Sequence, residues 1–133
     1  MAALSQGTDG NFYGSTYYGG ADGVGTVFRI TADGTLTTLA SFSLAGGGRY
    51  PNASLVQLKD GNFYGTTVLG GADGAGTIFR ITPDGTLTTV AEFNHDNGAA
   101  PYSALTPAGD GSFYGTTLNG GIGLGSIFRL TLN

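Results

Sequence analysis

The chain has 133 residues, of which 26 are Gly and none is Cys or Trp, and its net charge is -4 with only five basic residues. Gly averages roughly 7% of protein residues and costs about 1 kcal/mol inside a helix, so this content, spread along the whole chain, excludes a helical protein. Gly does not recur at every third position, which excludes collagen, and a content of 40% hydrophobic residues excludes a disordered linker. The small number of basic residues argues against a nucleic-acid partner. No apolar run approaches the roughly 18 residues of a membrane span.

What remains is an all-β protein, and its sequence repeats with a period near 50. Residues 10–42 and 61–93 align without a gap and are identical at 25 of 33 positions, and a third copy runs over 111–131, one residue shorter. A period of this size is typical of propeller blades. We therefore predict β-propeller blades at residues 1–52, 53–102 and 103–133, each a four-stranded antiparallel repeat, with the last lacking its outer strand.

The second repeat shows the expected elements most clearly. In chain order we predict strands at residues 53–58, 62–68, 77–82 and 86–93, because β-branched and aromatic residues fill these runs. Tight turns are expected at Asp60-Gly61 and Asp84-Gly85, where both residues tolerate a positive φ, and a longer Gly-rich loop covers 69–76. Seven of the nine acidic residues precede a Gly, so the acidity is mostly turn chemistry.

An arc of three blades leaves two sheet faces uncovered. Propellers usually close with about 4 to 8 blades. Each open sheet face of a three-blade arc would present about 350 Å², and the two faces together exceed the exposed apolar patch that a soluble monomer usually tolerates. We expect head-to-tail self-association, with six blades from a homodimer or nine from a homotrimer. The alternative is that the chain is an excised or designed fragment of a longer propeller with a purely structural role.

Three motifs resemble the tandem-repeat family called GloVer: a Gly-Asn-Phe-Tyr-Gly-Thr-Thr stretch, a Gly-Gly-Ala-Asp/Asn-Gly-Ala-Gly loop and a Phe-Arg-Ile-Thr strand. They stand at residues 61–67, 70–76 and 79–82, and the first repeat has equivalents at 10–16, 19–25 and 28–31. The third repeat lacks the loop Asp. The repeats are also similar to NHL-type propeller blades. The resemblance implies a bacterial secreted or cell-surface protein without established chemistry; Met1 to Ser5 show no signal peptide, so a secretion signal is expected outside this chain.

The longer loops are where a ligand is expected. Successive connections of an antiparallel blade alternate between its ends, so the Asp-Gly turns share one end and the loops at 17–25, 43–52, 68–76, 94–102 and 118–125 share the other. Function concentrates on such loops. The candidates for binding a glycan or a surface protein are Asp22, Arg49, Tyr50, Asp73, His95, Asp96 and Tyr102. For Tyr50 and Tyr102, each beside a Pro, packing at the start of an inner strand is the alternative role.

One Arg recurs in the third strand of every repeat, as Arg29, Arg80 and Arg129. An Arg between apolar neighbours is costly unless it is paired, and a Tyr or a loop Asp could pair with it by stacking or by a charge-assisted hydrogen bond. We interpret this Arg as a clamp between blades, with ligand contact as the alternative.

The sequence offers little that points to catalysis. The single His, His95, cannot form a multi-histidine metal site, no nucleophile elbow or phosphate-binding loop is present, and we expect no metal and no cofactor. Asp22 and Asp73 occupy one repeat position and would lie a full blade apart, which disfavours a catalytic carboxylate pair. A non-catalytic module is therefore the favoured function, and an extracellular glycan-active enzyme is the weaker alternative.

Overall fold

The computed structural model describes residues 3–132, and in that range the chain forms antiparallel strands and no helix. The all-β prediction is confirmed. Residues 1, 2 and 133, the outer ends of the first and third predicted blades, lie outside the described residues. The described part of the chain has no helix that could cross a membrane.

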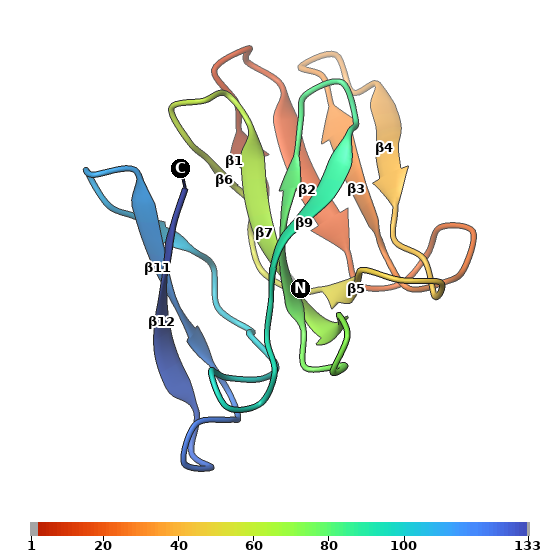
Figure 1. Ribbon diagram of the computed structural model, residues 1–133. Coiled ribbons are helices and arrows are strands. Elements are labelled where there is room, and N and C mark those ends of the chain that lie inside the picture. The colour runs from red at the N-terminus through yellow and green to blue at the C-terminus, as the bar shows by residue number, and fades with distance from the viewer. Residues whose placement is uncertain (1–2, 133) are drawn as a thin grey trace.

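The strands form three sheets that stand side by side (Figure 1). The first sheet contains β1 (Ser5–Gln6), β2 (Phe12–Thr16), β3 (Thr26–Ile30) and β4 (Leu36–Ser41). The second contains β5 (Gly48–Pro51), β6 (Val56–Gln57), β7 (Phe63–Gly70), β8 (Thr77–Ile81) and β9 (Leu87–Glu92). The third contains β10 (Thr106–Pro107), β11 (Ser112–Thr117) and β12 (Ser126–Thr131).

The connections divide between the two ends of the sheets. The short turns β1–β2, β3–β4, β6–β7 and β8–β9 lie at the top of Figure 1, and the longer loops lie at the opposite end. The Gly of every Asp-Gly pair has a positive φ, for example 83° at Gly61, and the Asp60 carboxylate accepts a hydrogen bond from the Asn62 amide at 3.0 Å. The turn interpretation of these pairs is confirmed.

The innermost strand differs from the prediction. We expected one strand at 53–58, but only β6 forms there, and β5 lies in a stretch predicted to be loop. Both pair with the long strand β7, β5 through Arg49↔Leu69 and β6 through Val56↔Tyr64. The loop prediction for residues 48–51 was wrong because Gly48 lets the backbone approach β7 closely: a Cβ there would lie 2.2 Å from Thr67 Oγ1.

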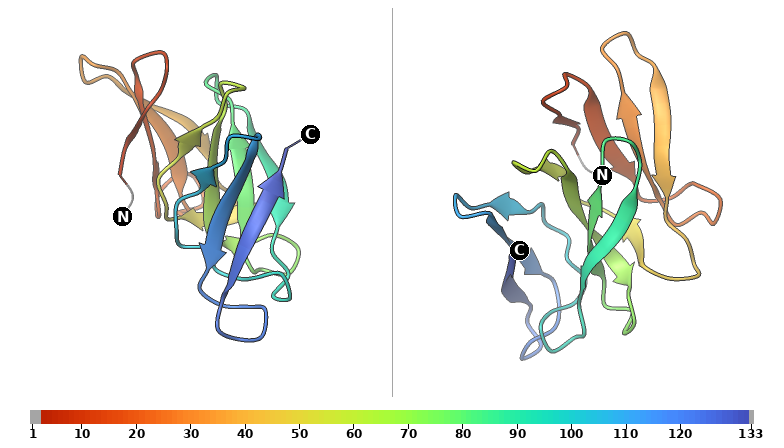
Figure 2. Two further views of the ribbon diagram at one scale, coloured as in Figure 1. Left: turned by 90° about the vertical axis from the view of Figure 1, so that its left-hand side faces the viewer. Right: turned by 45° about the horizontal axis from the view of Figure 1, so that its top comes forward.

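Figure 2 shows the three sheets from two further sides. Side chains between neighbouring sheets form the core. Tyr13 stacks on Phe63 with ring centroids 4.0 Å apart between the first and second sheets. The equivalent pair between the second and third sheets is Tyr64 and Phe113, at 5.5 Å. A second aromatic contact, Phe42 on Phe79, recurs as Phe93 on Phe128. The two junctions therefore repeat the same packing.

Candidate functional site

Three tyrosines meet at the long-loop end of the first two sheets. The Tyr17 and Tyr50 rings are stacked with centroids 4.9 Å apart, and Tyr18 meets both edge-on, at 4.8 Å from Tyr17 and 5.8 Å from Tyr50. We call Tyr17, Tyr18 and Tyr50 the tyrosine cluster. Only Tyr50 was a sequence candidate; Tyr17 and Tyr18 directly follow β2 and were missed.

The backbone around the cluster explains this arrangement. Tyr50 lies in β5, an inner strand of the second sheet, and has a left-handed φ of 62°. Its amide donates a hydrogen bond to the Val24 carbonyl at 2.8 Å. Val24 belongs to the β2–β3 loop, which begins with Tyr17 and Tyr18. This bond therefore ties β5 to that loop and brings the three rings into contact.

A hollow of about 380 Å³ lies beside the cluster. It is lined by Ser15, Thr16, Tyr17, Tyr18, Phe28, Pro51 and Asn52. None of these side chains is charged, and the polar groups are two hydroxyls, one amide and the tyrosine hydroxyls. The Ser15 hydroxyl is buried without a hydrogen-bond partner among the described residues. The hollow therefore combines aromatic walls with a few neutral polar groups.

Tyr102 extends this tyrosine-rich region toward the third sheet. It lines a second hollow of about 330 Å³ with Ser103, Thr116, Thr117 and Leu118. Burial raises the pKa of Tyr17. Repulsion from the neighbouring tyrosine hydroxyls, once these are ionised, raises that pKa further; these neighbours are Tyr102, Tyr18 and Tyr50. Two of the seven sequence candidates, Tyr50 and Tyr102, thus lie near a common region.

The other loop candidates do not converge with the tyrosines. Asp22 accepts a hydrogen bond from the Leu44 amide at 3.0 Å and so joins two loops. His95 has its Nε2 3.3 Å from the carbonyl oxygen of Asp73, and Asp96 is exposed beside it. Arg49 lies in β5 opposite Leu69. Within residues 3–132 no three His, Asp or Glu side chains gather in a way that could hold a metal ion.

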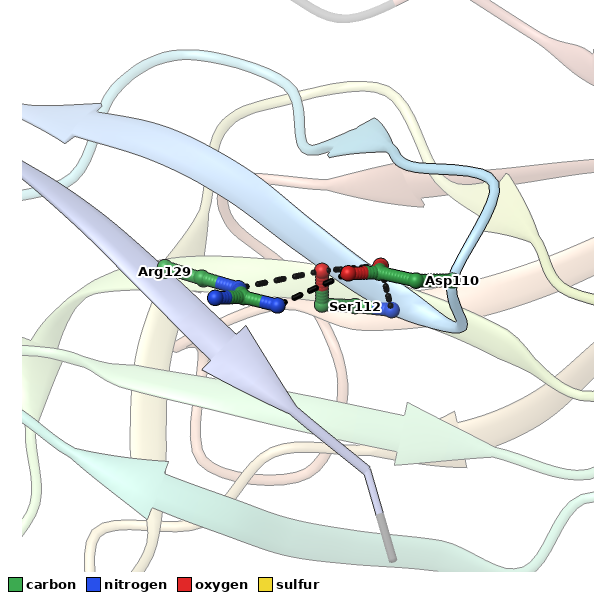
Figure 3. A network of polar contacts seen from close by, with 3 residues as sticks. All are labelled: Asp110, Ser112 and Arg129. Atoms are coloured by element: carbon green, nitrogen blue, oxygen red, sulfur yellow. Dashed lines mark hydrogen bonds and ion pairs between the residues drawn. The ribbon is translucent and has the colours of Figure 1, made fainter.

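The repeated Arg makes its clearest contact in the third sheet. Arg129 on β12 forms an ion pair with Asp110 at 2.7 Å and donates from Nε to the Ser112 hydroxyl at 3.2 Å (Figure 3). Its guanidinium also lies 5.8 Å from the centre of the Tyr114 ring. Asp110 and Ser112 belong to the same sheet as Arg129, so this pair braces a single sheet, and a clamp between blades stays a prediction.

The first two sheets use the equivalent Asp differently. The Tyr13 hydroxyl donates to Asp9 at 2.6 Å, and the Tyr64 hydroxyl donates to Asp60 at 2.7 Å. The Nε atoms of Arg29 and Arg80 are buried without a hydrogen-bond partner among residues 3–132. Sequence reasoning missed these Tyr–Asp bonds, although the constant spacing of four residues between Asp and Tyr was a signal.

A third hollow, of about 480 Å³, lies at the short-turn end between the second and third sheets. Its lining includes Leu58, Lys59, Asp60, Pro107 and Leu132. No sequence motif pointed to this hollow, because its walls come from residues of two repeats that only packing brings together. Its polar side chains are those of Gln57, Lys59 and Asp60, two of them charged, whereas the lining of the hollow beside the tyrosine cluster is uncharged.

Comparison with known proteins identifies the repeat and the fold. The Gloeobacter/Verrucomicrobia repeat matches residues 1–133, as the resemblance predicted. A streptogramin B lyase structure is similar with a TM-score of 0.60 at 22% identity, virginiamycin B lyase from Staphylococcus aureus with 0.59 at 20%, and a gluconolactonase-like protein with 0.59 at 22%. No curated protein matches the sequence.

These structural matches cover most of this chain but less than half of the others. The alignments span 98%, 97% and 96% of this chain, and 40%, 40% and 43% of the three solved chains. At this level of identity the likeness concerns the fold alone, which is an all-β, propeller-like arrangement of antiparallel sheets. The chain therefore corresponds in extent to about two fifths of such a protein.

Proposed function

We propose that this chain, which belongs to the Gloeobacter/Verrucomicrobia repeat family, is a non-catalytic β-propeller module that closes into a ring with further copies and binds a ligand at its long-loop end. Its three sheets are three blades, and the ring contains six blades from two chains or nine from three. One observation carries the assembly: the residues buried at both junctions have exposed counterparts at the two ends of the arc.

The third sheet exposes the side chains that the second sheet buries. Tyr64 and Ile78, which are 1% and 2% exposed, pack against the third sheet. Their counterparts in the third repeat, Tyr114 and Ile127, are 41% and 79% exposed. An Ile exposed to this extent on a strand is costly in water, and a neighbouring first sheet would remove it from water.

The first sheet offers the matching surface. Leu55 is 3% exposed at the junction of the first two sheets, and its counterpart Leu4 is 53% exposed. In a head-to-tail contact, Tyr114 of one copy would stack on Phe12 of the next, as Tyr13 stacks on Phe63 within the chain. Because the two surfaces differ, the contact is heterologous, and such contacts form rings when the rotation closes.

The placement of the titratable side chains supports a non-catalytic role. Asp22 is held by the Leu44 amide of its own repeat, and within residues 3–132 the His95 ring has the backbone carbonyl of Asp73 as its hydrogen-bond partner. The structural relatives named as lyase and gluconolactonase share the fold at 20–22% identity, and chemistry depends on site residues more than on fold.

Light scattering after size-exclusion chromatography tests the assembly. We expect a mass of two or three chains at micromolar concentration. Ile127→Glu, which places a charge on the exposed strand face, should give a monomer. The control is Ile122→Asp in the loop of the third repeat, where the second repeat has the exposed Asp73. This variant should leave the mass unchanged. A wild-type protein that stays monomeric contradicts the proposal.

A further inference from the structure

The tyrosine cluster stands where the repeats differ. The second repeat has Val68 and Leu69 at the positions of Tyr17 and Tyr18. The position equivalent to Tyr50 is Ala100, which has the same left-handed backbone, with φ of 54°. The fold therefore forms with aliphatic residues at all three positions. Tyr50 also packs against the core between the first two sheets, whereas Tyr17 and Tyr18 belong to neither core cluster of the described residues.

The exposure of Tyr18 points to a ligand. The Tyr18 side chain is 70% exposed, so folding leaves much of its ring in water. The positive φ at Tyr50 recurs at Ala100 and therefore belongs to the repeat fold. The exposed ring is unfavourable for the isolated chain and is explained if it contacts a ligand.

The lining of the adjacent hollow narrows the ligand class. Apart from Pro51, its side chains are aromatic or neutral and polar, and the Ser15 hydroxyl has no partner among the described residues. Without a basic residue in the lining, an anionic group such as phosphate would lack its usual partners. The hollow instead suits a neutral molecule that has both apolar C–H surface to stack on tyrosine and hydroxyls for hydrogen bonding.

We propose that the tyrosine cluster binds a neutral carbohydrate chain, with a sugar ring on Tyr17 and Tyr18, which line the hollow, and a sugar hydroxyl reached by Asn52. Tyr50 supports Tyr17 from behind through its stacked ring. This assignment rests on the binding role proposed above and names its ligand class. Proline-rich peptides also dock on aromatic residues, but they occupy extended grooves. The compact hollow of about 380 Å³ favours sugar rings.

Binding of the assembled wild-type protein to defined neutral oligosaccharides tests the proposal. The probes are cellohexaose, xylohexaose, mannohexaose and chitohexaose, with a polyproline peptide as the rival ligand. The absence of Trp makes the intrinsic tyrosine fluorescence directly readable, and calorimetry gives the affinity. We expect at least one oligosaccharide to bind and the peptide not to bind.

The decisive variant exchanges the cluster for the residues of the sister repeats: Tyr17→Val, Tyr18→Leu and Tyr50→Ala. We expect the oligosaccharide affinity to fall by at least about tenfold. The control is Ala32→Pro, which also introduces the residue of the second repeat, Pro83, but at the opposite end of the blade. This variant should bind like wild type. If the triple variant misfolds by circular dichroism, the exposed Tyr18→Leu alone takes its place.

Three results would overturn the assignment: no oligosaccharide bound by the wild type, unchanged affinity in the folded variant, or binding of the peptide alone. Light scattering on each sample separates this from the assembly. A ring that binds no sugar refutes the carbohydrate site and leaves the ring standing, whereas a monomer that binds sugar refutes the ring and leaves the site standing.

Discussion

The hydrogen bond between Tyr64 and Asp60 gives the repeated Asp a second role besides turn formation. Burial, followed by the hydrogen bond to Asp60, raises the pKa of Tyr64 to about 12. Partial burial raises the pKa of Asp60, but hydrogen bonds from Tyr64 and Asn62 outweigh it, so the pKa lies below its usual value. The same Asp therefore fixes the turn and anchors a ring that packs on the third sheet.

The raised pKa of Tyr64 predicts a loss of stability at high pH. The folded chain holds the phenolic proton up to about pH 12, whereas the unfolded chain releases it near pH 10. The stabilisation is complete below pH 10 and is lost as the pH rises toward 12, by on the order of 2 kcal/mol. Tyr64→Phe should lower the free energy of unfolding at pH 7 by about 1 kcal/mol and flatten this decline.

Urea unfolding between pH 7 and pH 11.5 measures this dependence. Tyr18→Phe is the control, because the Tyr18 ring is exposed and its replacement should leave the decline intact. An equally steep decline in Tyr64→Phe would show that another group is responsible.

At the scale of elements, the repeat predicts most strands well. The strands expected at 62–68, 77–82 and 86–93 correspond to β7, β8 and β9, because each has β-branched and aromatic residues bounded by Gly-containing turns. The split inner strand could not be predicted in this way. β5 contains Gly and Pro, which are poor strand formers, and it exists because β7 is long enough to pair with two separate segments.

The loops show the same limit for the candidate site. Sequence reasoning placed function at the long-loop end and selected Tyr50 and Tyr102. It did not select Tyr17 and Tyr18, although both lie in the long loop at 17–25. Arg49 and Asp96 were selected for their position on long loops, and neither belongs to the cluster. The useful signal was the difference between repeats, since Val68 and Leu69 replace Tyr17 and Tyr18 in an otherwise similar stretch.

The close approach of β5 to β7 makes Gly48 sensitive to substitution. In Gly48→Ala the new methyl group would meet the hydroxyls of Thr67 and Thr77, at 2.2 and 2.4 Å, which are themselves paired at 2.7 Å. We expect the free energy of unfolding to fall by about 1–3 kcal/mol, the usual cost of overpacking. Urea denaturation measures this effect.

Gly109→Ala provides the matched comparison. It makes the same chemical change where a Cβ meets no atom within 4 Å and φ is not positive, so the stability should change by less than about 0.5 kcal/mol. If the two variants were equally stable, the contact between β5 and β7 would not be as tight as the structure indicates.

At the scale of the whole molecule, the near-identity of the repeats links folding to assembly. Each junction within the chain joins one Tyr-bearing face to one Phe-bearing face, as Tyr13 on Phe63 and Tyr64 on Phe113. A sequence that encodes this junction twice also encodes the two free faces that would form it again. The surface that stabilises the arc is therefore the surface that would recruit a second copy.

This linkage predicts that thermal stability depends on protein concentration. If folded chains associate and unfolded chains do not, association stabilises the folded state by mass action, and the stabilisation grows with concentration. We expect the melting temperature to rise by several degrees over a hundredfold increase in concentration, since about 1 kcal/mol shifts it by roughly 4–8 °C in a small domain. Ile127→Glu should melt at a lower temperature that does not depend on concentration, whereas Ile122→Asp should follow the wild type.

Differential scanning calorimetry across this concentration range decides between a ring and a self-sufficient arc. A wild-type melting temperature that does not change with concentration would mean that the exposed face with Tyr114 and Ile127 stays uncovered in the folded protein.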